Sequence, residues 1–87
     1  MSDTLKAGET SLAVYRLQVD LAALGYLTSR DEFYGPSTTR AVTHFQETHG
    51  LPMTGAADPQ TVRRIKLELQ ERARQLQSAV AAAGQVA

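Results

Sequence analysis

Apolar residues recur along this chain at the three- and four-residue spacing of amphipathic helices, in three separate segments. The first helix is predicted to begin at a cap formed by Thr10 or Ser11 and to end at Gly25. The second is predicted to begin at Gly35-Pro36, with proline in the first helical position, and to end at Gly50. The inward faces of these two helices are expected to consist of Val14, Leu17, Leu21, Leu24, Ala41, Val42 and Phe45.

The third helix is predicted to begin after Asp58-Pro59, where an acidic cap also complements the helix dipole. Its apolar stripe is much longer than a small domain can cover, which predicts a compact domain over residues 10–69 and a helical extension over 70–87. The extension either binds a partner or another copy of the chain, or it is a solvent-exposed helix that frays. The stripe runs through Val62, Ile65, Leu69, Ala73, Leu76, Val80 and Ala83.

A helix-loop-helix unit occurs twice, and the two copies share the middle helix. The segment 35–42 returns as 58–65, each copy carrying Pro-x-Thr, and each is preceded by an apolar residue, a glutamine and a glycine. A glutamine beside an apolar stripe is partly removed from water, so its amide needs protein partners, and the backbone of the irregular loops can supply them. We expect structural roles, in preference to ligand binding, for Gln18, Gln46, Gly25, Gly50, Thr38 and Thr61.

Composition limits the chain to one small domain. The 87 residues carry no net charge and no cysteine, which excludes a disulfide framework and mildly favours a reducing compartment. Residues 1–9 are polar and predicted to be flexible. No signal peptide or membrane span is evident, so the chain is expected to be cytoplasmic as synthesised, and in the cell wall or outside the cell if it is delivered there or belongs to a longer protein.

Residues 59–87 carry five basic side chains against two acidic ones. No aromatic residue interleaves with them, so a solvated helix face is a better interpretation than a nucleic-acid site.

No catalytic constellation is visible. The serines have no histidine pattern around them, and the adjacent acids Asp31 and Glu32 are more typical of a loop than of paired catalytic carboxylates. His44 and His49 lie five residues apart on one helix, about 140° around its axis, and cannot clasp one ion. We therefore expect no enzyme activity, no metal site and no cofactor.

Aromatic and basic residues gather at the first loop. Tyr26, Phe33 and Tyr34 are expected mainly to close the core, but a tyrosine with an exposed edge also stacks on sugars or contacts peptides. Arg30 and Arg40 flank the same region and are suited to a ligand carboxylate, or are ordinary surface arginines.

The spacing of these residues resembles that of the peptidoglycan-binding domain family, found at the ends of many bacterial cell-wall hydrolases. The resemblance covers about residues 10–67. It departs from the family pattern at Glu32 and Asp58, which replace glycines, and at Thr54, which replaces an aspartate. Because glutamate adopts positive φ less readily than glycine, the first loop is predicted to be reshaped. The matching residues are Val14, Leu17, Gln18, Leu21, Leu24, Gly25, Tyr26, Asp31, Tyr34, Gly35, Thr38, Ala41, Val42, Phe45, Gln46, Gly50, Leu51, Gly55 and Thr61.

The resemblance implies an all-α, three-helix domain that binds peptidoglycan without catalysis and holds a hydrolase on its substrate. The groove is expected near the first loop, with Tyr26, Arg30, Asp31, Tyr34 and Arg40 as candidate contacts. The alternative is a protein-protein interaction module of a bacterial or phage injection-type assembly, docking or self-associating through Val62, Ile65, Leu69, Leu76 and Val80.

Overall fold

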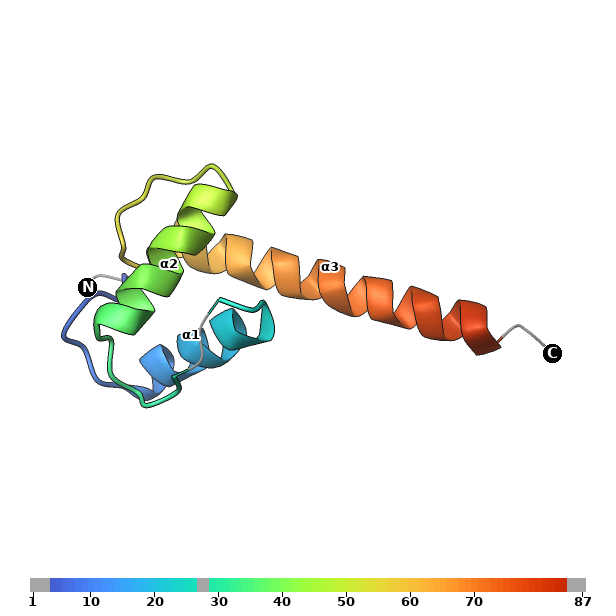
Figure 1. Cartoon of the computed structure of the whole chain (residues 1–87), viewed down its shortest axis with the longest axis horizontal. Coiled ribbons are helices and arrows are strands. Elements are labelled where there is room, and N and C mark those ends of the chain that lie inside the picture. Colours follow the sequence, from blue (N-terminus) through green and yellow to red (C-terminus); the bar gives the residue numbers. More distant parts are fainter. Residues whose placement is uncertain (1–3, 27–28, 85–87) are drawn as a thin grey trace.

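The computed structural model describes residues 4–26 and 29–84, with side chains described as far as Ser78. It contains three helices, α1 (Leu12–Ala23), α2 (Pro36–Thr48) and α3 (Pro59–Gly84), which confirms the all-α fold class. The helices cross one another around a single core, and α3 continues well beyond it (Figure 1). No described helix has the length and hydropathy needed to cross a bilayer.

Each helix begins and ends by the local chemistry of its sequence. Ser11 caps α1, its hydroxyl accepting a hydrogen bond from the Val14 N–H at 3.2 Å. Asp58 caps α3 in the same way, accepting from the Thr61 N–H at 2.8 Å. Gly25 and Gly50, at φ of +87° and +69°, terminate α1 and α2, because the left-handed conformation turns the next N–H back to a carbonyl of the last turn.

The core lies where the three helices meet the two loops. The apolar stripes of α1 and α2 are buried, as is Ile65 of α3. Two loop residues, Tyr34 and Ala57, are wholly buried as well, although the stripes alone did not predict them. The buried apolar set is Val14, Leu17, Leu21, Tyr34, Ala41, Val42, Phe45, Ala57 and Ile65.

The Gln18 amide holds the first loop against α1 and α2. Its oxygen accepts from the backbone N–H groups of Asp31 and Glu32, at 3.1 and 3.0 Å. Its nitrogen lies 2.9 Å from the Phe33 carbonyl oxygen, 3.0 Å from the Thr38 hydroxyl and 3.1 Å from an Asp31 carboxylate oxygen. The side chain is wholly buried, so these contacts take the place of water.

Gln46 repeats this arrangement at the second loop. Its oxygen accepts from the Gly55 N–H at 3.0 Å, and its nitrogen contacts the Ala56 carbonyl and the Thr61 hydroxyl, each at 3.0 Å. Thr54 takes the place of Asp31, with its hydroxyl 3.2 Å from the Gln46 nitrogen. The side-chain oxygen in each loop also accepts from the N–H two residues later, so a hydroxyl reproduces the turn that a carboxylate makes.

The first loop keeps a left-handed residue without a glycine. Glu32 has φ of +69°, close to the +75° of Gly55 at the equivalent position of the second loop. The expectation that glutamate would reshape this turn is therefore wrong. The hydrogen bonds from the Glu32 N–H and its neighbours to Gln18 hold the backbone where glycine would go, at the cost of local strain.

The N-terminal segment joins the two loops. Leu5 and Ala57 exchange both backbone hydrogen bonds, at 2.8 and 3.0 Å, and the Tyr34 N–H donates to the Glu9 carbonyl at 2.8 Å. The predicted flexibility of residues 1–9 therefore does not describe residues 5–9, which belong to the domain, while 1–3 lie outside the described residues. The pattern gave no sign of this pairing, because each bridge is isolated and no strand forms among the described residues.

The Tyr34 hydroxyl links the loops through the core. It donates to the Gly55 carbonyl at 2.5 Å, so the side chain spans from one loop to the other. The pKa of the Tyr34 phenol is raised to about 12, mainly by burial; a backbone hydrogen bond at Ala57 lowers this pKa and the nearby Glu9 carboxylate raises it.

Helix α3 has a packed part and a projecting part. Val62, Ile65 and Leu69 face the core, whereas the side chains from Gln70 to Ser78 are exposed, with Leu76 at 63%. Val80, also predicted to lie on the stripe, is outside the residues whose side chains are described. The projection gives the molecule its long axis, with extents of 53 × 26 × 23 Å (Figure 1).

We call the hydrogen-bonded amides of Gln18 and Gln46 the two clamps. Replacing each glutamine with glutamate should affect them differently. Gln18→Glu places a carboxylate against the Asp31 carboxylate, whereas Gln46→Glu faces hydroxyls that can rotate to donate. At pH 7 we expect both variants to lose stability, Gln18→Glu by about 3 kcal/mol or more and Gln46→Glu by less. Urea unfolding followed by helical circular dichroism measures the difference, which should narrow near pH 4 as the new buried carboxyl takes up a proton. Equal losses at pH 7 would contradict this account of the clamps.

Glu32→Gly should stabilise the protein by about 0.5 to 1 kcal/mol, because it removes the left-handed strain of a side chain while adding some chain entropy to the unfolded state. Thermal unfolding measures the shift. Glu47→Gly, at an exposed site inside α2, is the matched control and should destabilise by about 1 kcal/mol. Changes of the same sign in both variants would refute the strain at Glu32.

Raising the pH should weaken the fold through Tyr34. Its pKa is raised from 10.0 to about 12 in the folded state, so its contribution is fully present below pH 10 and is lost as the pH rises to 12. The stability difference between the native protein and Tyr34→Phe should therefore fall by about 2 kcal/mol over that range, since the other titrating groups are shared. Denaturant unfolding at pH 9 to 12 measures it, and a constant difference would oppose the assignment.

Candidate functional site

The first loop, the N-terminal segment and the start of α2 form an apolar groove of about 480 Å³, the first-loop groove. The Gln18 clamp produces its shape, because the bonds to residues 31–33 leave Phe33 and Tyr34 pointing in opposite directions. Tyr34 goes into the core, and the Phe33 ring remains 46% exposed. The groove is lined by Ala7, Gly8, Phe33, Tyr34, Gly35, Pro36, Thr39 and Arg40.

Gly35 leaves room for the Phe33 ring, which lines this groove. A Cβ added at Gly35 would stand 3.0 to 3.1 Å from two carbons of the Phe33 ring, closer than ordinary contact. The glycine therefore explains why α2 begins without a side-chain cap where α3 has Asp58. In the sequence, Phe33 was only one of three aromatic residues near the first loop. The backbone bridge between Thr10 and Phe33 gives this segment an extended conformation, in which Phe33 points outward and the next residue, Tyr34, points inward.

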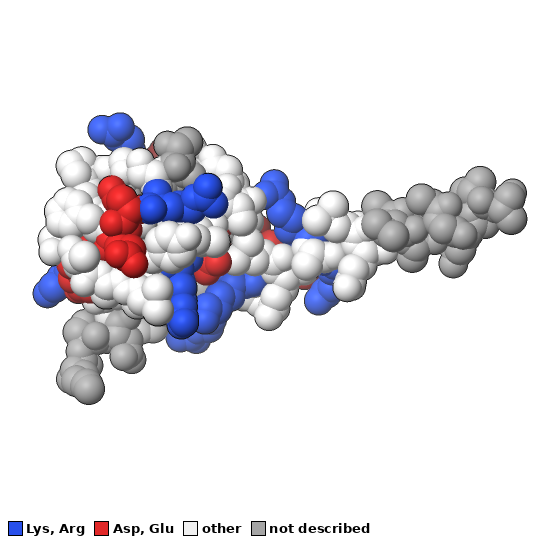
Figure 2. Space-filling model, turned by 90° about the horizontal axis from the view of Figure 1, so that it is seen from below, with Lys and Arg blue, Asp and Glu red and all other residues white. Residues whose placement is uncertain are grey.

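Arg40 lies at the rim of the groove, exposed and one turn into α2 from Pro36. It has no ion-pair partner among the described residues, so its guanidinium is available to an anion. Arg30 is exposed on the loop itself. Acidic and basic side chains lie next to one another over the globular part, as the face in Figure 2 shows.

Two of the predicted contacts make hydrogen bonds within the protein. Tyr34 lines the groove but is wholly buried, so its side chain is not exposed to a ligand in this conformation. Asp31 is exposed, but its carboxylate is engaged by the Gln18 amide and the Phe33 N–H. Both side chains turn toward the protein because the Gln18 amide holds the loop backbone on either side of them.

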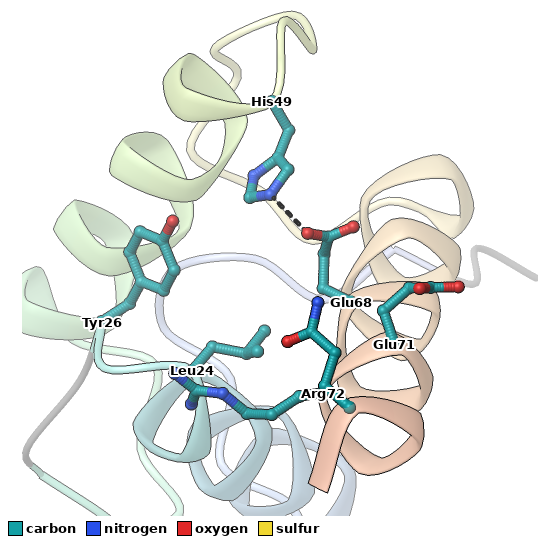
Figure 3. Close-up of a pocket in the computed structure, with 7 residues that line it drawn as sticks. Leu24, Tyr26, His49, Glu68, Glu71 and Arg72 are labelled. Carbon is teal, nitrogen blue, oxygen red and sulfur yellow. Dashed lines mark hydrogen bonds and ion pairs between the residues drawn. The ribbon is translucent and has the colours of Figure 1, made fainter. Parts of the chain in front are cut away.

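Tyr26 belongs to a different hollow, the three-helix pocket, of about 230 Å³. Figure 3 shows it opposite α3, with the Tyr26 ring and His49 on one side and Glu68 and Arg72 on the other. Tyr26 meets the rings of His44 and Phe45 edge-on, at 5.1 and 5.5 Å between centroids. The lining residues are Leu24, Tyr26, His49, Glu68, Glu71, Arg72 and Gln75.

Two side chains of the three-helix pocket contact carbonyl groups near helix C-termini. Arg72 donates to the Ala23 carbonyl at the end of α1. The two ring nitrogens of His49 lie 2.9 Å from the Phe45 carbonyl and 3.2 Å from a Glu68 carboxylate oxygen. Both neighbours of the ring are hydrogen-bond acceptors. The contact between His49 and Glu68 joins the end of α2 to α3, and no spacing pattern in the sequence indicates it.

The five predicted contacts therefore do not converge on one surface. Arg40 borders the first-loop groove, Tyr26 lies in the three-helix pocket, and the described residues contain no cluster of three side chains suited to a metal ion. What the first-loop groove offers is an exposed aromatic face beside an unpaired guanidinium, an arrangement for binding.

Comparison with known proteins identifies the fold. Residues 10–65 match the family described as "putative peptidoglycan binding domain". The chain is 37% identical, over 67 residues, to a zinc D-Ala-D-Ala carboxypeptidase of Streptomyces albus G, covering 74% of this chain and 26% of that protein. It therefore spans about a quarter of this relative.

Solved structures agree. The N-terminal domain of SleB superposes with a TM-score of 0.73 and 29% identity, covering 78% of this chain and 94% of that domain. The endolysin of Burkholderia phage AP3 gives a TM-score of 0.70 and 40% identity, covering 72% of this chain and 24% of the endolysin. The duplicated, amide-clamped three-helix unit described above is a member of the peptidoglycan-binding domain family.

Proposed function

We propose that this chain is a non-catalytic module that binds peptidoglycan in the bacterial cell wall, through the first-loop groove. Family membership and the wall-related names of its relatives support wall binding. The carboxypeptidase matches only through a region equal to 26% of its length, so its catalytic activity is not carried over to this chain.

The observation that carries the groove assignment is that Phe33 and Arg40 line the same groove and are both exposed. Peptidoglycan joins sugar strands to short acidic peptides. An aromatic face packs against the C–H face of a sugar, and a guanidinium binds a carboxylate through two parallel hydrogen bonds. The groove offers both beside an apolar floor, whereas Tyr26 lies in the three-helix pocket and Arg30 is a candidate contact at the edge of the loop.

Such a module acts by tethering. When it is joined to an enzyme that acts on the wall, each contact with the polymer raises the effective concentration of enzyme at its substrate. The alternative, an assembly module that docks through α3, is not favoured by the family or by the relatives.

Sedimentation with purified sacculi tests the proposal. Native protein should pellet with excess wall, and Phe33→Ala and Arg40→Gln should each weaken binding by about tenfold, the loss expected from a desolvated contact or a charged hydrogen bond. Controls of the same chemistry are Met53→Ala, an apolar side chain 61% exposed on the second loop, and Arg74→Gln on α3, both of which should bind normally.

Circular dichroism establishes that each variant is folded. Folded native protein that remains in the supernatant at high wall excess sinks the proposed function. Normal pelleting of both groove variants retains wall binding but removes it from this groove.

A further inference from the structure

The internal repeat places a second copy of the groove-rim chemistry at the start of α3. Aligning the two Pro-x-Thr motifs makes Arg63 the equivalent of Arg40, since each arginine lies two residues after the motif threonine, Thr61 or Thr38. Each of these threonines accepts a hydrogen bond from the clamp glutamine of its own repeat. One turn further on, Leu67 corresponds to His44. The repeat therefore presents the same guanidinium position twice in one small domain.

The structure has a pocket at this second position. The second-repeat pocket has a volume of about 200 Å³ and is lined by Leu51, Gln60, Arg63, Arg64 and Leu67. Leu51, just past the end of α2, packs partly against the core, and Leu67 is 50% exposed. The pocket thus combines two leucines with an amide and two guanidinium groups.

The charges here are not internally balanced. Arg64 pairs with a Glu68 oxygen at 3.4 Å, and the other Glu68 oxygen faces His49 at 3.2 Å, so this carboxylate is already shared. Arg63 is exposed and has no ion-pair partner among the described residues. An anion entering the pocket would therefore meet one guanidinium with all its N–H donors free, and a second with donors to spare.

Shape and polarity select among anions. The planar fork of an arginine matches a carboxylate, and the Gln60 amide can donate to it or accept from a neighbouring peptide N–H. The two leucines offer apolar contact for a small side chain next to the charge, which a bare inorganic anion does not use. A peptide C-terminus with a small apolar last residue fits this combination.

We propose that the second-repeat pocket binds the free C-terminal carboxylate of a short peptide ending in a small apolar residue, with Arg63 as the principal contact. The proposal rests on the proposed function, because it gives the module a second contact with the peptide part of the polymer that the first-loop groove holds. Two weak contacts on one polymer reinforce each other, since the second forms at high effective concentration.

The test uses N-acetyl-D-alanyl-D-alanine as the probe and its C-terminal amide as the neutral match, titrated into the ¹⁵N-labelled chain by nuclear magnetic resonance. The acid should shift the backbone signals of residues 60–67 and the amide should not. Arg63→Gln should lower the affinity by at least about tenfold, as expected for losing a charged hydrogen bond. Arg74→Gln, on an exposed turn of the same helix, should leave it unchanged.

Three outcomes would overturn the pocket assignment: no shift at saturating acid, equal shifts with acid and amide, or shifts that persist in folded Arg63→Gln. Shifts confined to Arg40 and its neighbours would also overturn it, by assigning the carboxylate to the first-loop groove. Sedimentation of the same variants with sacculi separates the two proposals. If native protein pellets but the probe shifts no signal at 60–67, wall binding is supported and the pocket assignment is refuted. If the probe binds but native protein does not pellet, the pocket assignment is supported and wall binding is refuted.

Discussion

Two buried amides hold this fold together. Each loop runs without a strand or helix to pair its backbone, and its N–H and carbonyl groups would be left unsatisfied against the core. Gln18 and Gln46 supply donors and acceptors in the geometry the loops need, and no buried side-chain nitrogen or oxygen among the described residues lacks a partner. Because each amide spans a helix, a loop and the next helix, removing one would release three elements together.

The surface follows from this constraint. The first clamp fixes residues 31–33, which sends Tyr34 into the core and leaves Phe33 facing outward beside Arg40. Tyr34 then reaches the second loop through its hydroxyl, so the groove floor and the second loop are mechanically connected. In the proposed site these hydrogen bonds position the groove residues before a ligand arrives, which reduces the ordering cost of association. The hydrogen bond from the Glu32 N–H to Gln18 also explains why the first loop tolerates a glutamate with positive φ.

The two repeats share the same turn geometry but differ in the residues that form it. Asp31 and Thr54 make the same turn with a carboxylate and a hydroxyl, and Glu32 and Gly55 adopt the same left-handed φ. The helix starts differ for a reason that concerns the surface, since Gly35 makes room for the Phe33 ring while Asp58 caps α3. The two repeats therefore share a frame and present different surfaces, an apolar groove in one and a pocket with paired arginines in the other.

The sequence alone determined the helices, their caps and stops, and the positions of Gln18 and Gln46, because periodicity, capping and the placement of glycine and proline are local effects. It also determined the family, since the repeat preserves those spacings. Tertiary structure alone decided that Tyr34 is buried, that Asp31 is occupied by Gln18, that residues 5–9 join the loops, and that Tyr26 and Arg40 face different hollows. Each of these depends on contacts between residues far apart in the chain, from 13 residues between Gln18 and Asp31 to 52 between Leu5 and Ala57, for which no local pattern exists.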